Sequence, residues 1–290
     1  MAKPAIHVGT TFEERAGRVD EDAAIAYALA TNDPNPIYQR GGAVPPLYTV
    51  SLILPAYIEG HGRSADPGAV EGVRGGVHGE HDVYFHAPVV PGMAVRWADT
   101  VHSARQTPAG AMLTQRILVT DEDRNPLVEH FWSTLLIGGT IEADLGPPLA
   151  DHTFPADARD RPIGSRTFEV TGDQTFRYAG ASTDHAAFHV DDGAARQAGF
   201  PGKFLQGLCT FAMCSGAVVE LAAGGDPADL RRLACRFAAP VFPRSELTVE
   251  LFDAGHTPEG GRAVAFEARS GGATVIRHGR AELAPAGGSG

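Results

Sequence analysis

Residues 204–223, with the sequence FLQGLCTFAMCSGAVVELAA, are apolar on nearly every side when the segment is drawn as a helix. A surface helix has one apolar stripe and one polar face, so a helix without a polar face is buried. Alternating apolar and polar residues typical of strands follow at 247–252, 262–268 and 273–283. A long buried helix beside several antiparallel strands predicts an α+β fold.

The same order of elements occurs once before in the chain. Residues 21–30 and 47–58 are predicted helices, and 112–119 with 127–136 predict a β-hairpin across the turn DEDRNP. In the second half, 171–181 is the predicted counterpart of the first of these helices.

Two pairs of matching segments, separated by nearly the same number of residues, indicate a duplication. Residues 27–38 (YALATNDPNPIY) and 178–189 (YAGASTDHAAFH) share Tyr, two Ala and Asp at an offset of 151. The segments APVVPG and APVFPR, which begin at Ala87 and Ala239, match at an offset of 152. We therefore expect a first domain at 1–145, a second at 161–285, a Pro-rich linker at 146–160 and a flexible tail at 286–290.

Composition excludes several classes of protein. The 290 residues carry a formal charge of −11 and are 43% hydrophobic, which indicates a globular chain that does not bind nucleic acid. No apolar run is long enough for a membrane helix, and the N-terminus lacks the apolar core of a signal peptide. Three cysteines in apolar surroundings predict reduced core thiols, so we expect a cytoplasmic protein.

One constellation in the second half has the residue types that acid–base chemistry needs. Asp184 lies six residues after Tyr178, and His189 follows five residues later. A Gly-Phe-Pro segment and the run Leu-Gln-Gly at 205–207 come next. Alone, Asp184 would most often cap a turn and His189 would be a structural histidine. Together, on one short loop, they can face the same water molecule.

These motifs resemble those of the MaoC-like (R)-specific enoyl-CoA hydratases, the hydratase 2 family. There, Asp-x-Asn-Pro-aliphatic-His is followed by Gly-Phe and His-Gly-Leu. The first half is similar to the N-terminal hotdog of the hydratase 2 domain in peroxisomal multifunctional enzymes, through Ala43-Val-Pro-Pro46 and Val77-His-Gly-Glu80. The resemblance covers about residues 15–285. It implies a double hotdog fold, two tandem repeats in which a long helix is wrapped by an antiparallel sheet.

The resemblance also implies residue roles. Asp184 and His189 would hold the water and relay its proton, and the Gly207 N–H would bind the thioester oxygen. Gln206 is either a substrate contact or simply the first residue of its helix. Lys203 either meets a CoA phosphate or is solvated, and Ser182 is a further candidate for substrate binding. No cofactor and no metal is implied.

The chain departs from the family pattern at several positions. Ala186 and Ala187 replace the motif's Asn and Pro, and Gln206 replaces the His of His-Gly-Leu.

The first half keeps Asp33, Asn35 and Pro36 but has Tyr38 in place of the His. Any active site of this type therefore belongs to the second half, and the first half is expected to shape the acyl tunnel.

Other groups of chemistry-bearing residues are weaker candidates. His78, His81 and His86 have a spacing seen in metal sites, but they lie in a strand-like stretch without a second ligand cluster. Cys209 and Cys214 lie inside the apolar helix without a cationic neighbour, which predicts core packing.

The sequence thus predicts a cofactor-free lyase that reversibly hydrates trans-2-enoyl-CoA to (R)-3-hydroxyacyl-CoA. One alternative is a dehydratase or cyclase that acts on an unusual or carrier-protein-bound acyl group in a polyketide-type pathway. Another is a non-catalytic thioester-binding subunit that needs a hotdog partner. Since one chain already contains two repeats, we expect a monomeric pseudo-dimer or a homodimer whose partner is an acyl-CoA or acyl carrier protein.

Overall fold

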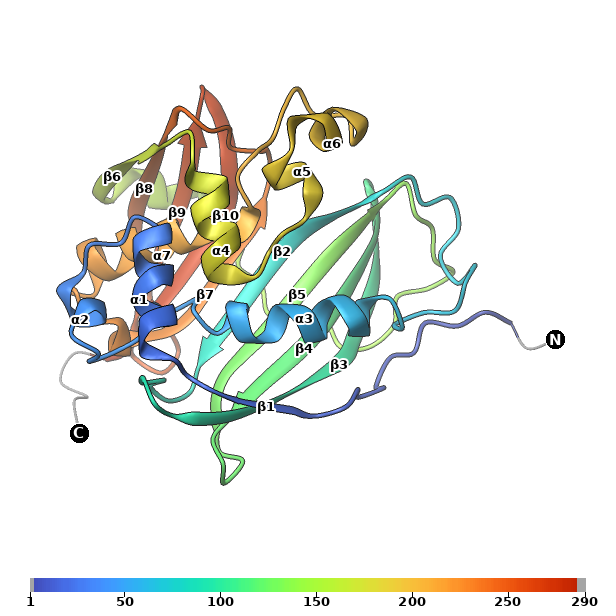
Figure 1. Cartoon of the computed structure of the whole chain (residues 1–290), viewed down its shortest axis with the longest axis horizontal. Coiled ribbons are helices and arrows are strands. Elements are labelled where there is room, and N and C mark those ends of the chain that lie inside the picture. The colour runs from blue at the N-terminus through green and yellow to red at the C-terminus, as the bar shows by residue number, and fades with distance from the viewer. Residues whose placement is uncertain (1–2, 286–290) are drawn as a thin grey trace.

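The computed structural model describes residues 3–285 and places ten strands in one antiparallel sheet, with the main helices along one of its faces (Figure 1). The predicted tail at 286–290 lies outside the described residues. From one edge of the sheet to the other, the strands are β1 (Arg15–Arg18), β3 (Ala94–Thr107), β4 (Gly110–Thr120), β5 (Pro126–Ile137), β2 (Gly76–Phe85), β7 (Leu230–Phe237), β10 (Ala273–Leu283), β9 (Arg262–Ser270), β8 (Ser245–His256) and β6 (Pro162–Val170).

The two halves of the sheet have the same strand connectivity. Counted outward from the centre, the strands of the first half are the second, fifth, fourth, third and first along the chain, and the second half repeats this order. The halves meet where β2 pairs with β7, with His81 opposite Cys235, so the sheet continues without a break between them. The predicted α+β fold of two tandem repeats is confirmed by this arrangement.

Each half has one long helix and one shorter helix. In the first half these are α3 (Val50–His61) and α1 (Glu21–Ala30), with the single turn α2 (Pro36–Gln39) between them. In the second half they are α7 (Gly207–Ala222) and α4 (Gln174–Ser182), separated by α5 (Ala187–Val190) and α6 (Asp192–Gln197). Two short 3₁₀ helices, η1 (Ala156–Asp160) and η2 (Pro227–Asp229), complete the list.

Helix α7 is buried as its apolar sequence predicts, because every residue from Leu208 to Val219 is buried. The helix begins at Gly207 rather than at Phe204. The residues before it continue in an extended path, in which the Leu205 N–H donates to the Val241 carbonyl at 2.7 Å. The apolar pattern starts before the helix because Leu205, in this extended segment, packs into the same core.

Helices α1 and α4 pack together across the axis that relates the halves (Figure 1). The duplicated residues Tyr27 and Tyr178 meet there, with their hydroxyl oxygens 3.3 Å apart and both rings fully buried. Burial raises the pKa of both phenols far above neutrality. The repeat found in the sequence therefore forms the central contact between the halves.

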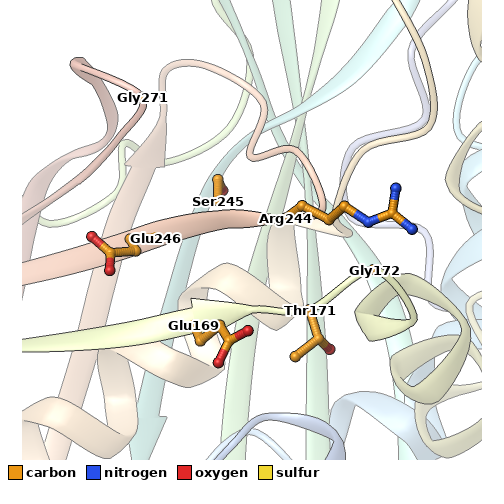
Figure 2. Close-up of a pocket in the computed structure, with 7 residues that line it drawn as sticks. All are labelled: Glu169, Thr171, Gly172, Arg244, Ser245, Glu246 and Gly271. Carbon is orange, nitrogen blue, oxygen red and sulfur yellow. The ribbon is translucent and has the colours of Figure 1, made fainter.

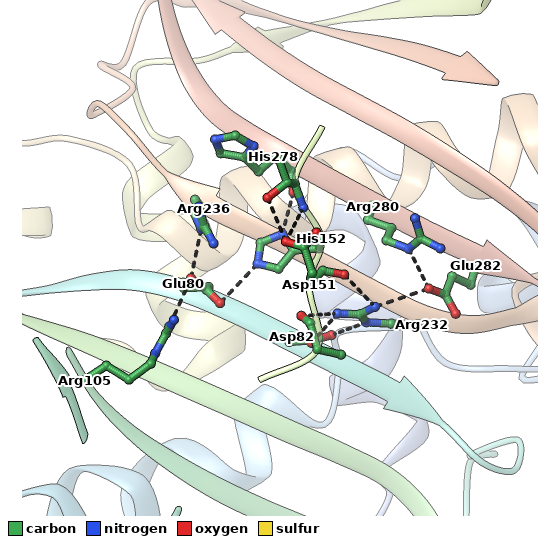
Figure 3. Close-up of polar contacts among 12 residues, drawn as sticks. Glu80, Asp82, Arg105, Asp151, His152, Arg232, Arg236, His278, Arg280 and Glu282 are labelled. Atoms are coloured by element: carbon green, nitrogen blue, oxygen red, sulfur yellow. Dashed lines mark hydrogen bonds and ion pairs between the residues drawn. The ribbon is translucent and has the colours of Figure 1, made fainter. Parts of the chain in front are cut away.

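A buried charge network joins the halves on the sheet face opposite the helices (Figure 3). Arg232 on β7 donates from Nε and Nη2 to the two carboxylate oxygens of Asp82 on β2, at 3.0 and 2.8 Å. Glu80 lies 3.0 Å from Arg236 and 3.1 Å from His152 of the predicted linker. Burial raises the pKa of Glu80, but His152 and Arg236 outweigh burial and hold it at about 2. Removing one partner would leave an uncompensated buried charge and so would destabilise the contact between the halves.

Candidate active site

The loop between α4 and α5 brings Asp184 and His189 toward the start of α7. Helix α4 ends at Ser182, and Thr183 follows with a left-handed φ of 64°. A β-branched residue rarely adopts this conformation, so the turn is held by its surroundings. The Ser182 hydroxyl donates to the Tyr178 carbonyl at 2.8 Å and accepts from the Asp184 N–H at 3.3 Å. Ser182, a predicted substrate contact, is itself fully buried and supports this turn.

His189 is held in one tautomer. Its Nδ1 lies 2.8 Å from the carbonyl oxygen of Phe204, and a carbonyl oxygen only accepts hydrogen bonds. Nδ1 therefore carries the proton, and Nε2 keeps a lone pair when the ring is neutral. Burial lowers the pKa of His189, against the opposing charge of Asp184, so the ring is neutral at pH 7. The side chain thus presents a proton acceptor at neutral pH.

Asp184 is the second acceptor of the loop. Its side chain is half-buried, and Oδ1 accepts a hydrogen bond from the Ala186 N–H at 3.3 Å. The remaining oxygen lone pairs can accept from water or substrate. The charge of Asp184 acts on the His189 ring strongly enough to counter part of its desolvation. The predicted pair is therefore brought together by the fold, one member acidic and the other a neutral imidazole.

Gly207 is the first residue of α7, where backbone N–H groups have no acceptor within the helix and the helix dipole favours negative charge. A side chain at this position would place its Cβ 3.2 Å from the ring of Phe237 on β7. A side chain here would therefore crowd the Phe237 ring, and glycine leaves the backbone N–H open to close approach. Gly207 can supply an oxyanion-binding donor.

Gln206 ties the loop to the helix start. Its amide nitrogen donates to the carbonyls of Thr175, at 3.1 Å, and Asp184, at 3.3 Å. Its Oε1 is buried and has no hydrogen-bond partner among residues 3–285. Both of the bonded groups are carbonyls, so the amide nitrogen must face them and Oε1 must face away. Gln206 therefore supports the loop and leaves one acceptor for a bound molecule.

Lys203 lies four residues before Gly207, at the rim of a cavity of about 430 Å³. Its Nζ is 3.6 Å from Asp192, and its backbone N–H donates to the same carboxylate at 2.8 Å. The structure thus separates the predicted residues into two groups. Hydrogen bonds connect Asp184 to Gln206 and His189 to Phe204, and Gly207 directly follows these residues, while Lys203 lines a separate cavity.

The equivalent position in the first half lacks a proton acceptor at the His site. Tyr38 occupies it, is 1% exposed, and has its pKa raised far above neutrality by burial. Asp33 accepts from the Asn35 N–H at 3.0 Å, and the Asn35 side chain donates to the Gly225 carbonyl at 2.7 Å. These residues connect α2 to the end of α7 and have a structural role.

Of the three histidines with metal-like spacing, His78 and His81 lie on β2, as expected for polar residues on a strand, and His86 directly follows it. His78 Nε2 lies 3.1 Å from His81 Nδ1, and His81 Nε2 lies 3.1 Å from His130 Nδ1. His86 instead contacts Glu129. No group of three or more potential ligands within residues 3–285 is arranged to hold a metal ion.

Two residues of the site were missed by sequence reasoning. Phe204 orients His189 through its backbone carbonyl, and Phe237 packs on Gly207 through its ring. Neither a backbone carbonyl nor an apolar ring gives a chemical signal in sequence. The sequence could have indicated Phe237 only through its place at the end of strand β7, and this strand was not predicted.

Comparison with known proteins points to the part of the chain that contains these residues. The model of the MaoC like domain matches residues 155–271, which contain the whole Asp184–Gly207 segment. A 3-hydroxyacyl-thioester dehydratase Y of Mycobacterium tuberculosis is 31% identical over 193 residues, which cover 65% of this chain and 64% of that protein. The second half of the chain therefore contains a segment similar to the MaoC like domain. A probable enoyl-CoA hydratase 2 of Dictyostelium discoideum is 26% identical to this chain over 145 residues, 49% of each protein.

Solved structures show which fold the chain shares. A MaoC-like dehydratase from Phytophthora capsici has a TM-score of 0.82 at 20% identity and covers 97% of this chain and 98% of its own. A Mycobacterium tuberculosis protein with a double hotdog fold has a TM-score of 0.60 at 16% identity and covers 95% and 96%. The predicted double hotdog fold is confirmed. The matched segments span less than two thirds of the first two curated relatives.

No helix within residues 3–285 is both long enough and apolar enough to cross a membrane.

Proposed function

We propose that this chain reversibly hydrates trans-2-enoyl thioesters to (R)-3-hydroxyacyl thioesters. One observation carries the proposal. Asp184 and His189, two proton acceptors, are tied by hydrogen bonds to residues 204–206, the segment that ends at the free N–H of Gly207. Addition of water to an unsaturated thioester needs acceptors for the water and a donor for the thioester oxygen.

In this mechanism the Asp184 carboxylate and His189 Nε2 each accept a hydrogen bond from one water molecule. The two acceptors orient the water oxygen toward C3 of the enoyl group. As the C–O bond forms at C3, the C2=C3 electrons move into an enolate whose oxygen accepts from the Gly207 N–H. The proton released by the water passes to the Asp184–His189 pair and then to C2. Dehydration follows the same steps in reverse.

The size of the electrostatic contribution follows from the position of Gly207. A preorganised donor aimed at a developing oxyanion typically lowers the barrier by about 3–4 kcal/mol. General acid–base groups typically contribute a further factor of roughly 100 to 10,000 in rate. Both effects need the water and the oxyanion to be placed together, which the shared segment 204–207 provides.

The acyl group would extend from Gly207 into the first half along a stack of rings. Phe237, beside Gly207, lies 4.5 Å from His78 between ring centroids, and His78 stacks on Trp132 at 4.5 Å. Trp132 stacks in turn on Tyr57 of α3 at 3.9 Å. This continuous row crosses from the second half to the first, which supports a role of the first half in holding the acyl group.

A second candidate is dehydration of a 3-hydroxyacyl group on a carrier protein. The replacement of the family's Asn, Pro and His by Ala186, Ala187 and Gln206 favours it, because these residues alter the loop that supports Asp184. The same catalytic residues would serve a CoA substrate or a carrier-protein substrate.

The test uses the purified full-length chain with crotonyl-CoA and with a longer trans-2-enoyl-CoA. Loss of the enoyl absorbance is followed, and the configuration of the 3-hydroxy product is determined by chiral chromatography. The proposal expects formation of the (R)-alcohol. An (S)-product, or no turnover by folded protein with CoA or carrier-protein thioesters, would exclude it.

A further inference from the structure

Arg244 occupies a backbone conformation that favours glycine. Its φ is 64°, and in the first half the duplicated position is Gly92, with a φ of 83°. Both residues donate their N–H to the same partner in the repeat, Arg244 to the Val170 carbonyl and Gly92 to the Val19 carbonyl. A non-glycine residue in this region typically costs about 1 kcal/mol or more. An arginine at position 244 therefore has a conformational cost, which the glycine at the equivalent position of the first half does not have.

Arg244 is exposed, and its guanidinium is free to bind a ligand. Within residues 3–285 it has no ion pair and no side-chain hydrogen bond. A Cβ on Gly172 would lie 3.1 Å from Arg244 Nε, so the absence of a side chain at 172 makes room for it. Figure 2 shows the side chain extending toward Gly172, away from Glu246.

Two neighbouring cavities share Arg244 and Gly172. The smaller, of about 430 Å³, is also lined by Lys203 and by Asp192, which is already paired with that lysine. The larger, of about 750 Å³, contains Glu169 and Glu246. The smaller cavity thus has two cationic side chains and one carboxylate, which is already paired with one of the cations. Its excess positive charge suits an anion better than the larger cavity does.

We propose that Arg244, together with Lys203, binds the phosphate at the end of the pantetheine arm of the thioester substrate. Arginine binds phosphate through two parallel charge-assisted hydrogen bonds. Residues 203–207 connect this cavity to the Gly207 N–H and span at most about 14 Å when extended. A pantetheine arm can bridge this distance, with its thioester at Gly207 and its phosphate at Arg244.

The proposal rests on the proposed thioester activity and names the group by which the substrate is held. The phosphate on pantetheine is common to CoA and to acyl carrier proteins. Because the chain has a net charge of −11, an anionic substrate needs local cations to approach this surface. An unpaired arginine beside the segment leading to Gly207 meets this need.

The test compares three substrates, crotonyl-CoA, S-crotonyl-4′-phosphopantetheine and S-crotonyl-pantetheine, with wild-type protein and Arg244→Gly. For wild type, both phosphorylated substrates should have a KM roughly tenfold or more below that of the pantetheine thioester. Arg244→Gly should abolish most of this preference through KM and leave kcat unchanged. It should also raise Tm, because glycine relieves the positive φ.

Arg124→Gly is the matched control. Arg124 also has a positive φ, of 67°, but it is exposed on the β4–β5 hairpin and pairs with Glu14. The control should leave all three KM values unchanged. Equal substrate preference in wild type and Arg244→Gly would overturn the proposal, as would an Arg244 effect confined to crotonyl-CoA.

Calorimetric binding of CoA separates this inference from the proposed function. If wild type turns over none of the substrates but binds CoA with roughly tenfold higher affinity than Arg244→Gly, the hydratase proposal fails and the phosphate site stands. If wild type turns over the substrates and Arg244→Gly does not weaken CoA, the phosphate site fails alone.

Discussion

Grafting the first-half loop into the second half should stabilise the protein. The change is Ala186→Asn with Ala187→Pro, which copies Asn35 and Pro36. The backbone already fits, since Ala186 has φ −54° and ψ 128° and Asn35 has φ −57° and ψ 119°. Ala186 makes no side-chain capping bond at the start of α5, whereas the Asn35 side chain accepts from the Ile37 N–H at 3.1 Å.

The magnitude follows from these two local gains. A side-chain cap is typically worth about 1 kcal/mol. Proline at a compatible position adds about 0.4–1 kcal/mol by restricting the unfolded chain, and Ala187 opens α5, where the N–H has no acceptor within the helix. The neighbouring changes need not add fully, so we expect about 1–2 kcal/mol. For a chain of this size that corresponds to a Tm increase of about 2–6 °C.

Thermal melting and urea denaturation of wild type and the double variant measure this change. The reciprocal variant Asn35→Ala should lose stability by about 1–3 kcal/mol, because Asn35 also donates to the Gly225 carbonyl. An unchanged or lower Tm for the graft, in protein with a native circular dichroism spectrum, would refute the reasoning that the second-half loop lacks its cap.

Two pH-dependent predictions concern buried titratable groups. Burial raises the pKa of Asp99 to about 7 against the hydrogen bond from Gln115, so wild-type stability falls as pH rises from about 4 to 7. Asp99→Asn should match wild type near pH 4 and exceed it by roughly 1–3 kcal/mol at pH 8 in urea denaturation; a difference that does not vary with pH would contradict this. Because burial lowers the pKa of His189 from its ordinary value of 6.5, the acid limb of kcat/KM should have its midpoint below pH 6.5. An acid limb with its midpoint above 6.5 would show that the ring is not the buried acceptor described here.

Much of the fold was predictable because the duplicated elements have strong patterns. The helix at 21–30 and the strands around 112–119 and 127–136 occur where the sequence predicts them, and each strand extends a few residues further. The inner strands β3 and β7 were not predicted. Strands β1 and β6, at the two edges of the sheet, were also missed. They are short or largely exposed on one side, so they lack the apolar alternation that reveals a central strand.

The candidate site was predictable as a set of residues and not as a geometry. Asp184, His189 and Gly207 stand out by type and spacing, but nothing local shows that His189 donates to the Phe204 carbonyl. The role of Gln206 was left open in the sequence because its two acceptors come from α4 and the loop. The importance of Arg244 becomes visible only when its φ is compared with that of Gly92.

The most direct test of the central claim compares Asp184→Asn with Asp33→Asn, the same substitution at the duplicated position of the first half. Initial rates of crotonyl-CoA hydration are measured for both variants and for wild type, after circular dichroism has shown that each is folded. The account predicts that Asp184→Asn lowers kcat roughly 100- to 10,000-fold, while Asp33→Asn stays within a few-fold of wild type. Wild-type turnover by folded Asp184→Asn would contradict it.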